Sequence, residues 1–510
     1  MDWTSGYVTD VNYTYGYYRE LNPFFANLLL TFSGYQAPSF STACELGFGQ
    51  GVSLNVHNAS SPINWYGTDF NPSQSAFAMQ LNDRISGGAL IADDDFEKFC
   101  SRDDLPQFDY IGMHGIWSWV SDTNREILVD FIGRKLKVGG VLYLSYNTSA
   151  GWSPMLPIRE LLVEYSKKMS GPGGGSISRI NDSLNFARKF QKADPLFIKS
   201  NPSIVNRMEQ IYKQDRQYVA HEYFNDEWSP MSFLQIQKQL LNSKVTYATS
   251  ADPLQSISHL NVSNEQLEIL KEIPDPGLKQ CLIDLFTNQT FRKDYWIKGP
   301  QMLTPTQRHN KLRDHRVALI KNIADIEYKV KGPRGDAILK EDQYRPLIMA
   351  LSDYKPRTLG ELAEKVKDVT NFGNVVEAAI VLTGMGVISF AQGTSKLKER
   401  LPFCRKINRE IVARSWDAAD ISYLASPIIG GGLSVSRFEQ LFLLALDQKV
   451  TQTEELADLV WKNLSKRGQK IVKDGKTLES PEENLEELQR LAKNFLENRL
   501  EVLKAMNVEL

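Results

Sequence analysis

Short apolar runs alternate with amphipathic stretches between residues 39 and 170. The stretch 123–136 has apolar side chains at helical spacing, and residues 137–140 after it read as a helix stop and turn. Regular alternation of strands and helices predicts a mostly parallel sheet with helices on both faces. Ligands of such sheets bind beyond the carboxyl ends of the strands. The predicted strands are 39–45, 64–69, 89–92, 108–113 and 141–147.

The rest of the chain lacks this alternation. A Gly-rich stretch at 171–176 predicts a flexible joint after an α/β domain at 1–170. Residues 171–330 read as a mainly helical cap with no further strand–helix–strand unit, and 331–400 as three short helices and a strand, which resembles a winged helix. Residues 401–510 read as a C-terminal helical module, with helices expected at 436–446, 452–464 and 481–506.

Composition excludes several classes of protein. The 510 residues are 42% hydrophobic and 24% charged with a net charge of -2, as in ordinary globular proteins. The absence of a basic excess speaks against a nucleic-acid partner. Four scattered cysteines indicate neither a disulfide framework nor a metal site. Without a signal-like start or an apolar run of about 18 residues, we expect a cytoplasmic protein that does not insert into membranes.

The most informative motif is Glu-Leu-Gly-Phe-Gly-Gln-Gly at 45–51, which follows the first predicted strand. Glycines there let the backbone turn tightly and approach a ligand. Asp69 ends the second predicted strand, where an acid accepts the hydroxyls of a ribose. The spacing is G-x-G-x-G after a Glu, which differs from the dinucleotide fingerprint G-x-G-x-x-G. It therefore favours S-adenosylmethionine and predicts methyl transfer.

Acids after the third strand extend this prediction. One of Asp93, Asp94 and Asp95 is expected to accept the adenine amino group, with Asp94 preferred over Asp95, and Phe96 to cover the ring. The others are solvated or cap a helix. The predicted cofactor-binding residues are Glu45, Gly47, Gly49, Gly51, Asp69, Asp94, Asp95 and Phe96.

Polar and aromatic side chains also follow the fourth and fifth strands. His114, Trp117 and Trp119 come after the fourth strand, where indole rings shape a cleft or else belong to the core. Tyr146, Asn147 and Trp152 come at or after the end of the fifth, facing the cleft or satisfying their own backbone. Farther on, the string His221, Glu222, Tyr223 lines the cleft or is a surface or capping feature.

These strings together resemble the bacterial methyltransferases that carry a methyltransferase regulatory domain, including the rickettsial outer-membrane-protein lysine methyltransferases. The resemblance rests on residues 45–51, on 109–120, on 140–152 and on 218–223, together with Tyr13 and Pro23. It covers residues 7–245 and is faint beyond 330. The family commonly has His where this chain has Asn22, so an N-terminal histidine role does not carry over.

The resemblance implies a Rossmann-like class I methyltransferase fold with a helical cap over the active site, a protein or peptide substrate and a homodimer. For a lysine acceptor, His114 or His221 would take the proton and Tyr146 would orient the amine. The residues expected to bind substrate are Tyr13, Tyr18, Trp117, Trp119, Asn147, Trp152, Glu222 and Tyr223.

Two alternatives stay open from the sequence. In a small-molecule methyltransferase, the cap would enclose a closed apolar pocket instead of a peptide groove. In a catalytically silent binding protein, the winged-helix-like region would contact partners, including nucleic acid, through a positive face. The near-neutral net charge speaks against the second.

Overall fold

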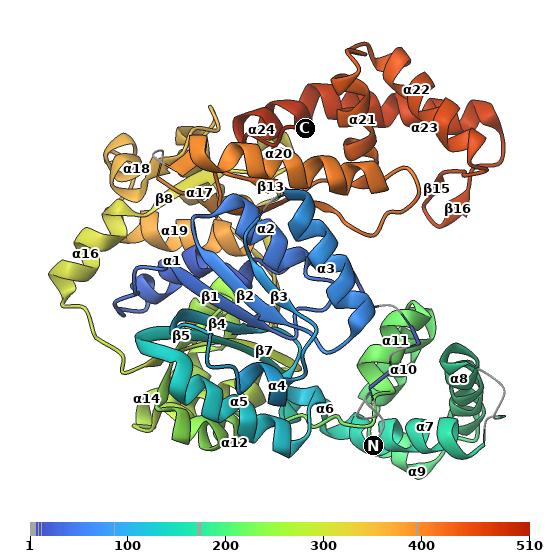
Figure 1. The fold of residues 1–510 in the computed structure, drawn as a ribbon. Helices are drawn as coiled ribbons and strands as arrows, with labels where there is room; N and C mark the ends of the chain where they lie inside the picture. The colour runs from blue at the N-terminus through green and yellow to red at the C-terminus, as the bar shows by residue number, and fades with distance from the viewer. Residues whose placement is uncertain are drawn as a thin grey trace.

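A seven-stranded sheet runs through the middle of the molecule (Figure 1). We describe the fold from a computed structural model, which covers residues 7–8, 10–11, 13–85, 87–169, 171, 175–393 and 396–510. Part of the predicted Gly-rich joint, residues 172–174, lies outside these described residues.

The sheet has the strand order β3-β2-β1-β4-β5-β7-β6. Strands β1 to β5 are parallel, whereas β7 runs antiparallel to both β5 and β6. The strands are β1 (Thr42–Leu46), β2 (Asn64–Thr68), β3 (Leu90–Ala92), β4 (Phe108–Met113), β5 (Leu136–Asn147), β6 (Val245–Ser250) and β7 (Phe291–Lys298). The α/β fold predicted from the alternating pattern is confirmed.

Strand β5 begins earlier than the sequence predicts. Residues 137–140 are part of the strand, so the predicted turn there is wrong. The pairing with β4 shifts register between Phe108 and Tyr110, which accommodates Gly139 at a φ of 80°. A glycine pair inside a strand therefore marks an irregularity of the ladder here.

Helices cover both faces of the sheet. One face packs against α1 (Pro23–Phe32), α2 (Val52–Ser60) and α3 (Pro72–Ile85). The other packs against α4 (Phe96–Cys100), α5 (Asp122–Lys135), α12 (Phe233–Gln239) and α15 (Pro276–Thr287). Helices α13 (Ser258–Asn261) and α14 (Asn264–Glu272) lie between β6 and β7 in the chain.

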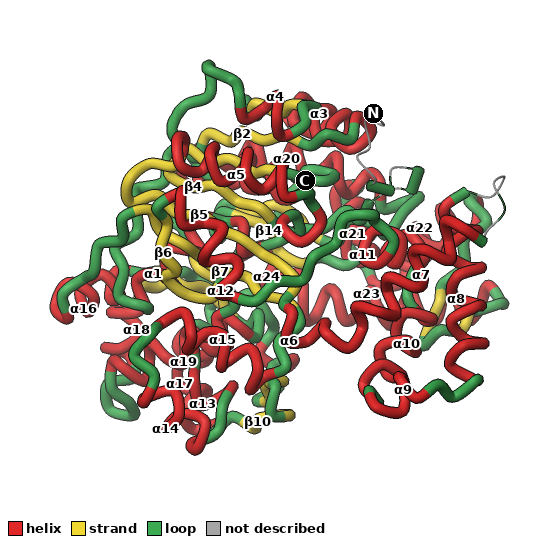
Figure 2. Tube along the Cα trace, turned by 90° about the horizontal axis from the view of Figure 1, so that it is seen from below, coloured by secondary structure: helices red, strands yellow, loops and turns green. Residues whose placement is uncertain are grey.

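The stretch 171–330 is not a cap alone, because β6 and β7 complete the central sheet. Before them lies a helical lobe that projects beside the sheet (Figures 1 and 2). The lobe has a hydrophobic core of its own, which also takes in Val11 of the N-terminal segment. Its helices are α6 (Ser149–Trp152), α7 (Leu156–Lys168), α8 (Ser176–Lys192), α9 (Leu196–Ser200), α10 (Ser203–Lys213) and α11 (Arg216–Tyr223).

The winged-helix prediction for 331–400 is not confirmed. The small sheet has the order β11-β8-β12, so its middle strand precedes the helices in the chain, and β12 leads into a long helix instead of a returning wing strand. The elements are α16 (Pro305–Asp314), β8 (Arg316–Leu319), the hairpin β9 (Lys329–Gly332) and β10 (Gly335–Ile338), α17 (Glu341–Ala350), β11 (Arg357–Thr358), α18 (Leu359–Lys365), α19 (Phe372–Gly384) and β12 (Ile388–Phe390).

The last hundred residues contain the three predicted helices, the third of which is interrupted by a π-helical turn at Phe495–Arg499. They also contain two hairpins. The elements are α20 (Leu397–Arg414), β13 (Tyr423–Ser426), β14 (Gly431–Ser434), α21 (Arg437–Asp447), α22 (Thr453–Lys466), β15 (Val472–Lys473), β16 (Lys476–Thr477), α23 (Pro481–Asn494) and α24 (Leu500–Ala505).

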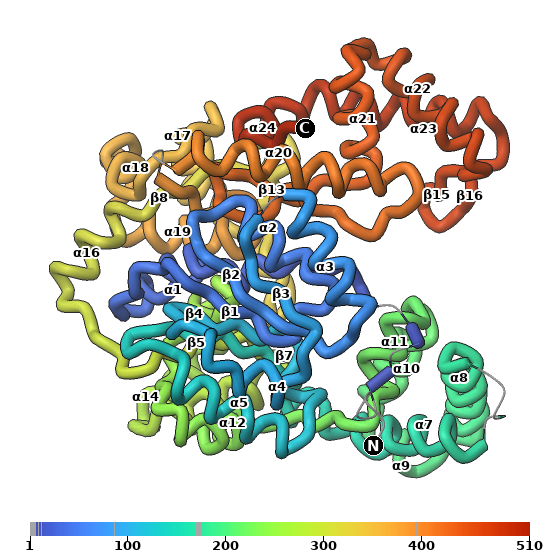
Figure 3. Tube along the Cα trace, in the orientation of Figure 1, coloured from blue at the N-terminus to red at the C-terminus, as the bar shows by residue number. Residues whose placement is uncertain are grey.

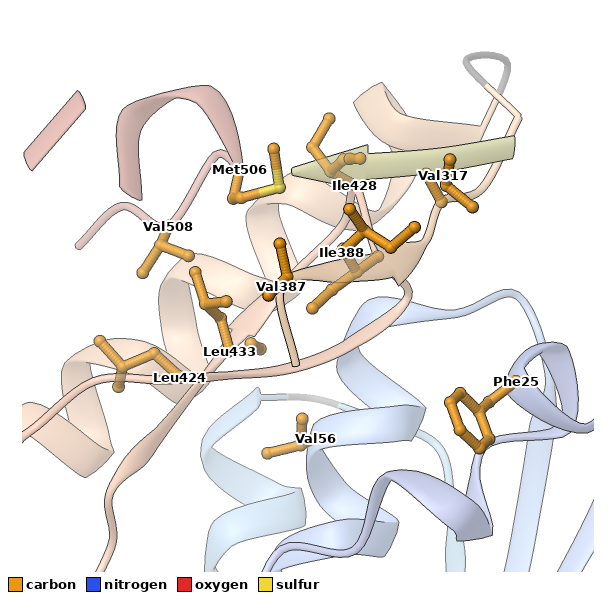
Figure 4. Packing of buried hydrophobic residues seen from close by; sticks show 14 of the residues in the cluster. Phe25, Val56, Val317, Val387, Ile388, Leu424, Ile428, Leu433, Met506 and Val508 are labelled. Atoms are coloured by element: carbon orange, nitrogen blue, oxygen red, sulfur yellow. The ribbon is translucent and has the colours of Figure 1, made fainter. Parts of the chain in front are cut away.

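The C-terminal region crosses over the α1 and α2 side of the sheet, as the orange and red tube in Figure 3 shows. Its buried side chains and those of α1 and α2 form one continuous hydrophobic cluster. Figure 4 shows Phe25 and Val56 below Val387 and Leu433 in this cluster. The two regions therefore share a core and stabilise each other. Among the described residues, no helix combines the length and the apolar character that crossing a bilayer demands.

The N-terminal segment is fixed to the sheet by two buried phenols. The hydroxyls of Tyr110 on β4 and Tyr295 on β7 both donate to the backbone oxygen of Glu20, at 2.9 and 2.7 Å. The Glu20 carboxylate, in turn, lies 2.6 Å from the Lys293 ammonium. Tyr17 and Tyr18 are therefore held above the carboxyl ends of the strands.

A buried ion network joins β7 to α15 and β5. The Arg292 guanidinium, 3% exposed, lies 2.7 Å from an Asp284 oxygen and 2.9 Å from an Asp294 oxygen. It also donates to Gln280 at 2.8 Å, and the Tyr146 hydroxyl donates to Asp294 at 2.9 Å. The one guanidinium thus lies between two carboxylates, and each charged group of the network has a partner of opposite sign, as a buried network requires.

Replacing Asp294 with Ala should lower the free energy of unfolding by about 1–3 kcal/mol, because it leaves the buried Tyr146 hydroxyl and the Arg292 Nε–H without their acceptor. Urea unfolding followed by tryptophan fluorescence measures this. The control is Glu268→Gln, which removes an exposed partner of Lys271 and should not shift the midpoint. Equal midpoints for both variants would show that the network does not stabilise the sheet.

Candidate active site

The glycine loop between β1 and α2 turns tightly, and neighbouring side chains pack closely against it. Gly47, Gly49 and Gly51 have φ values of 70°, 59° and 66°, which side-chain-bearing residues rarely adopt. A Cβ on Gly47 would lie 2.3 Å from Ile116 Cδ1, and one on Gly51 would lie 2.5 Å from Ala78 Cβ. Backbone and neighbours therefore both require glycine at these two positions.

Asp69 fixes the loop to the end of β2. One carboxylate oxygen accepts from the Gly49 N–H at 2.8 Å, and the other accepts from the Asn71 N–H at 3.0 Å. Burial raises the pKa of Asp69 to about 6, although these two N–H groups lower it. The carboxylate borders the cavity described next, with its orientation set by the backbone.

Glu45, at the carboxyl end of β1, is 3% exposed. Its Oε2 has no hydrogen-bond partner among the described residues. Burial and the nearby Asp69 raise the pKa of Glu45 to about 8. Buried polar atoms are nearly always paired, so this oxygen could accept a donor from outside the chain, although Glu45 is not among the residues that line the cavity described next.

A cavity of about 410 Å³ opens at this edge of the sheet and is here called the cofactor cavity. Gly47, Gly49 and Asp69 line one end of it, as the sequence predicts, and Phe96 and Ile116 provide apolar walls. Asp94 and Asp95 line it as well. Asp94 is buried and ion-paired with Lys98 and, at 3.4 Å, with Arg102, whereas Asp95 is exposed and caps α4 by accepting from the Lys98 N–H.

His114 forms part of the wall of this cavity beside Gly115, whose φ of 64° turns the chain after β4. The imidazole Nδ1 lies 2.7 Å from the Tyr143 hydroxyl, and the Tyr18 ring stacks on it with centroids 3.6 Å apart. Burial lowers the pKa of His114 to about 3, so the ring is neutral at pH 7. The geometry makes His114 a flat, uncharged wall.

A narrow extension of about 40 Å³, here called the side channel, adjoins the cofactor cavity. The two spaces share Tyr13, Trp119 and two other residues. The titratable and aromatic side chains that line the side channel are Tyr7, Tyr13, Trp119, Tyr218, His221 and Glu222.

Glu222 and His221 enter this channel from helix α11. Burial raises the pKa of Glu222 to about 7, while Arg207 and the nearby Asn147 amide lower it. His221 Nε2 lies 3.0 Å from the Val11 carbonyl oxygen, to which it donates, and its ring contacts Tyr7 and Tyr13. The sequence string 221–222 is therefore part of this site.

Four residues expected in the cleft lie elsewhere. Tyr146 points into the core on the other face of the sheet, bonded to Asp294. Trp117 is in the same core, and its indole N–H donates to Gln239. Trp152 and Tyr223 belong to the core of the helical lobe. Side chains alternate between the two faces of β5, so Tyr146 points away from the site. Trp117, Trp152 and Tyr223 are large side chains that pack into hydrophobic cores instead.

Other cavity residues were missed from the sequence. Tyr218 precedes Glu222 by one helical turn, so helical spacing could have found it. Ile116 lies inside the predicted string after β4 but was passed over between the tryptophans. Phe70, Gln74, Asn124 and Glu227 also line the cofactor cavity, and no motif marks them.

Comparison with known proteins identifies the family of this chain. The family model described as "Predicted methyltransferase regulatory domain" matches residues 215–298, which here run from α11 to the end of β7. An uncharacterized protein of Synechocystis sp. is 36% identical over the whole length of both chains. The chain belongs to the class I methyltransferases that carry a methyltransferase regulatory domain.

Two further comparisons extend the similarity to rickettsial proteins. The methyltransferase is 28% identical to an uncharacterized protein of Rickettsia prowazekii over 54% of this chain and 49% of the other. A solved structure, PKMT2 from Rickettsia typhi in complex with AdoHcy, superposes with a TM-score of 0.67 at 16% identity, covering 98% of this chain and 99% of that one. At that identity the match shows a shared fold.

The residues present fit S-adenosylmethionine, the cofactor that the sequence predicts. The unpaired Glu45 oxygen suits an amino group, the fixed Asp69 carboxylate suits ribose hydroxyls, and the bare glycines leave space for a ligand against the backbone. In the described ranges, no group of three His, Cys, Asp or Glu side chains is arranged to hold a metal ion.

Substituting Gly47 with Ala should weaken binding of S-adenosylhomocysteine at least about tenfold, because the new methyl group displaces Ile116 from the cavity wall. Isothermal titration measures the affinity. The control is Gly88→Ala, since Gly88 has the same φ of 70° but no atom within 4 Å of its Cβ position. If both variants bind equally well, crowding at Gly47 does not shape the site.

Proposed function

We propose that this methyltransferase transfers methyl groups to the side-chain nitrogen of lysine in proteins. The side channel is the observation that supports this proposal. Its volume of about 40 Å³ falls far below the roughly 300–1,000 Å³ of sites that enclose small molecules. A slender alkyl chain with a cationic end fits such a space, because aromatic rings attract both parts and Glu222 compensates the charge. The resemblance to lysine methyltransferases agrees with it.

In this proposal the cofactor cavity binds S-adenosylmethionine and the side channel binds the lysine side chain. Asp69 binds the ribose hydroxyls, Glu45 binds the amino group at the methionine end, and Phe96 packs on the adenine. When bound, S-adenosylmethionine supplies an electrophilic methyl group. Tyr13 and Trp119 border both spaces, so they orient the acceptor toward the cofactor cavity and exclude water.

Glu222 is the proposed proton acceptor. An unperturbed lysine ammonium has a pKa of about 10.4 and must lose a proton before its nitrogen attacks. The Glu222 carboxylate takes that proton at one of its oxygens. His114 suits this role less, because its Nδ1 faces Tyr143 and its ring lies under Tyr18. His221 donates its Nε2–H to Val11, and Nδ1, the ring nitrogen that could accept a proton, is fully buried. We therefore assign both histidines to positioning, and Tyr146 to the ion network.

Isotope-labelled S-adenosylmethionine, incubated with fractionated lysate of the source cell, tests the proposal. We expect label on a protein, in methylated lysine after acid hydrolysis. The same lysate incubated without the enzyme serves as the control for background label. Label on a small molecule, or on another amino acid, would contradict the lysine assignment.

Glu222→Gln tests the proton acceptor through pH. For the native enzyme, kcat/KM should rise with pH through about 7, because Glu222 accepts a proton only when ionised and its raised pKa places that ionisation there. The variant should lose roughly 100-fold in kcat and lack this rise.

The matched control is Glu209→Gln on the exposed side of α10, which removes the same charge outside the channel. Its pH profile should match that of the native enzyme. The neighbouring Tyr7, Tyr13 and Tyr218 have raised pKa values and stay neutral across this range. A variant Glu222→Gln with the native profile would exclude Glu222 as the proton acceptor.

A further inference from the structure

A second large cavity lies on the opposite side of the Tyr18–His114 stack from the cofactor cavity. It encloses about 520 Å³ and is here called the cationic cavity. The N-terminal segment from Tyr17 to Phe25 forms one wall, and β12 and β14 of the C-terminal region form the other. Tyr18 lines it directly, whereas His114 lines the cofactor cavity. The two cavities are thus separated by one pair of stacked rings.

This cavity is a rigid feature of the fold. The Tyr17 hydroxyl accepts from the Gly432 N–H at 2.7 Å and lies 3.1 Å from His57 Nε2. The Asn22 side chain donates to the Gly430 carbonyl at 2.8 Å. These bonds join the N-terminal segment to the β13–β14 hairpin, so both walls are fixed relative to the catalytic sheet.

Positive charge is in excess inside this cavity. Lys293 is neutralised by Glu20 at 2.6 Å, and Arg499 by Glu439 at 3.2 Å. Arg19 and Lys321 remain. Within the described chain neither has a carboxylate at ion-pair distance, and the Arg19 guanidinium donates only to the backbone carbonyls of residues 383 and 384. Two cations in a recess attract an anionic partner.

Strand edges line the same space. β12 is the outer strand of the order β11-β8-β12, and β14 pairs only with β13. Within the described chain, the edge of β12 opposite β8 therefore has no neighbouring strand. An exposed strand edge binds an extended peptide through main-chain hydrogen bonds.

We propose that the cationic cavity binds an extended acidic segment of the protein acceptor. The partner being an acceptor rests on the proposed function. The cations select acidic side chains, and the strand edges select a polypeptide backbone. Nucleic acid suits the space less, because it is bound through many phosphate contacts whereas only two cations are unpaired and the net charge is -2.

The position of Tyr18 links this cavity to catalysis. Its hydroxyl lies close to Tyr13 and Thr14, which line the side channel, and its ring covers His114. A segment in the cationic cavity therefore lies against Tyr18, which packs behind residues that line the acceptor site. This arrangement lets an acidic segment and a lysine of one protein be recognised together.

The test uses a fluorescein-labelled (Glu-Val)4 peptide, which contains no lysine, and fluorescence anisotropy with the full-length enzyme. We expect binding that weakens as salt is raised. The double variant Arg19→Met/Lys321→Met should bind it at least about tenfold more weakly. The matched control, Lys462→Met/Lys476→Met, removes two exposed lysines elsewhere and should bind as the native enzyme does. Titration with S-adenosylhomocysteine confirms that each variant is folded.

Two further probes separate the parts of the proposal. The same peptide with alternate backbone nitrogens methylated should bind more weakly, since it cannot extend a strand edge. A single-stranded oligonucleotide should not compete. Unchanged binding of the peptide to the double variant, or tighter oligonucleotide binding that this variant loses, would overturn the proposal.

Activity measurements tie the site to the acceptor. The substrate is the protein that the labelling experiment identifies, prepared without methylation. For this substrate, KM of the double variant should be about tenfold higher than that of the native enzyme, and kcat should be unchanged. An unchanged KM overturns the role in acceptor binding. If lysine is labelled but the peptide does not bind, the cavity proposal fails and the proposed function stands. If the peptide binds but only a small molecule is labelled, both the proposed function and the acceptor role fail.

Discussion

The backbone oxygen of Glu20 accepts hydrogen bonds from two buried phenols, and the three neighbouring spaces depend on this arrangement. Tyr110 and Tyr295 come from β4 and β7, so the N-terminal segment is fixed at the carboxyl ends of the strands. The ring of Tyr18 is thereby held on His114, and Tyr17 reaches the β13–β14 hairpin. Cofactor cavity, side channel and cationic cavity share walls because this one segment passes between them.

Residues that line the cofactor cavity were predictable to a greater degree than those that line the side channel. Gly47, Gly49 and Asp69 are found by local spacing, because a tight strand–helix turn and an acid at the next strand end are local events. Glu222 could only be placed through the resemblance, since α11 reaches the site from a separate lobe. Tyr146 shows what a strand pattern does not predict. Side chains at a polar strand end point to both faces of the sheet, and only the packing of the whole fold decides which face holds the site.

The strands missed from the sequence have a common reason. β6 and β7 lie between helices in a stretch whose average pattern is helical, and β7 carries Arg292, Lys293 and Asp294 in its middle. Charges normally argue against a central strand. Here Arg292 and Asp294 belong to a compensated network and Lys293 pairs with Glu20, so long-range partners permit a strand that its local sequence disfavours.

The helical lobe and the C-terminal region differ in how they are attached. The C-terminal region shares its hydrophobic core with α1 and α2, so its sequence cannot change without affecting the sheet beneath. The lobe has a separate core, yet it supplies Tyr218 and Glu222 to the side channel. Mutations in the lobe can therefore accumulate without disturbing the glycine loop. In such a family, the preference for the methyl acceptor can change more freely than the binding of the cofactor.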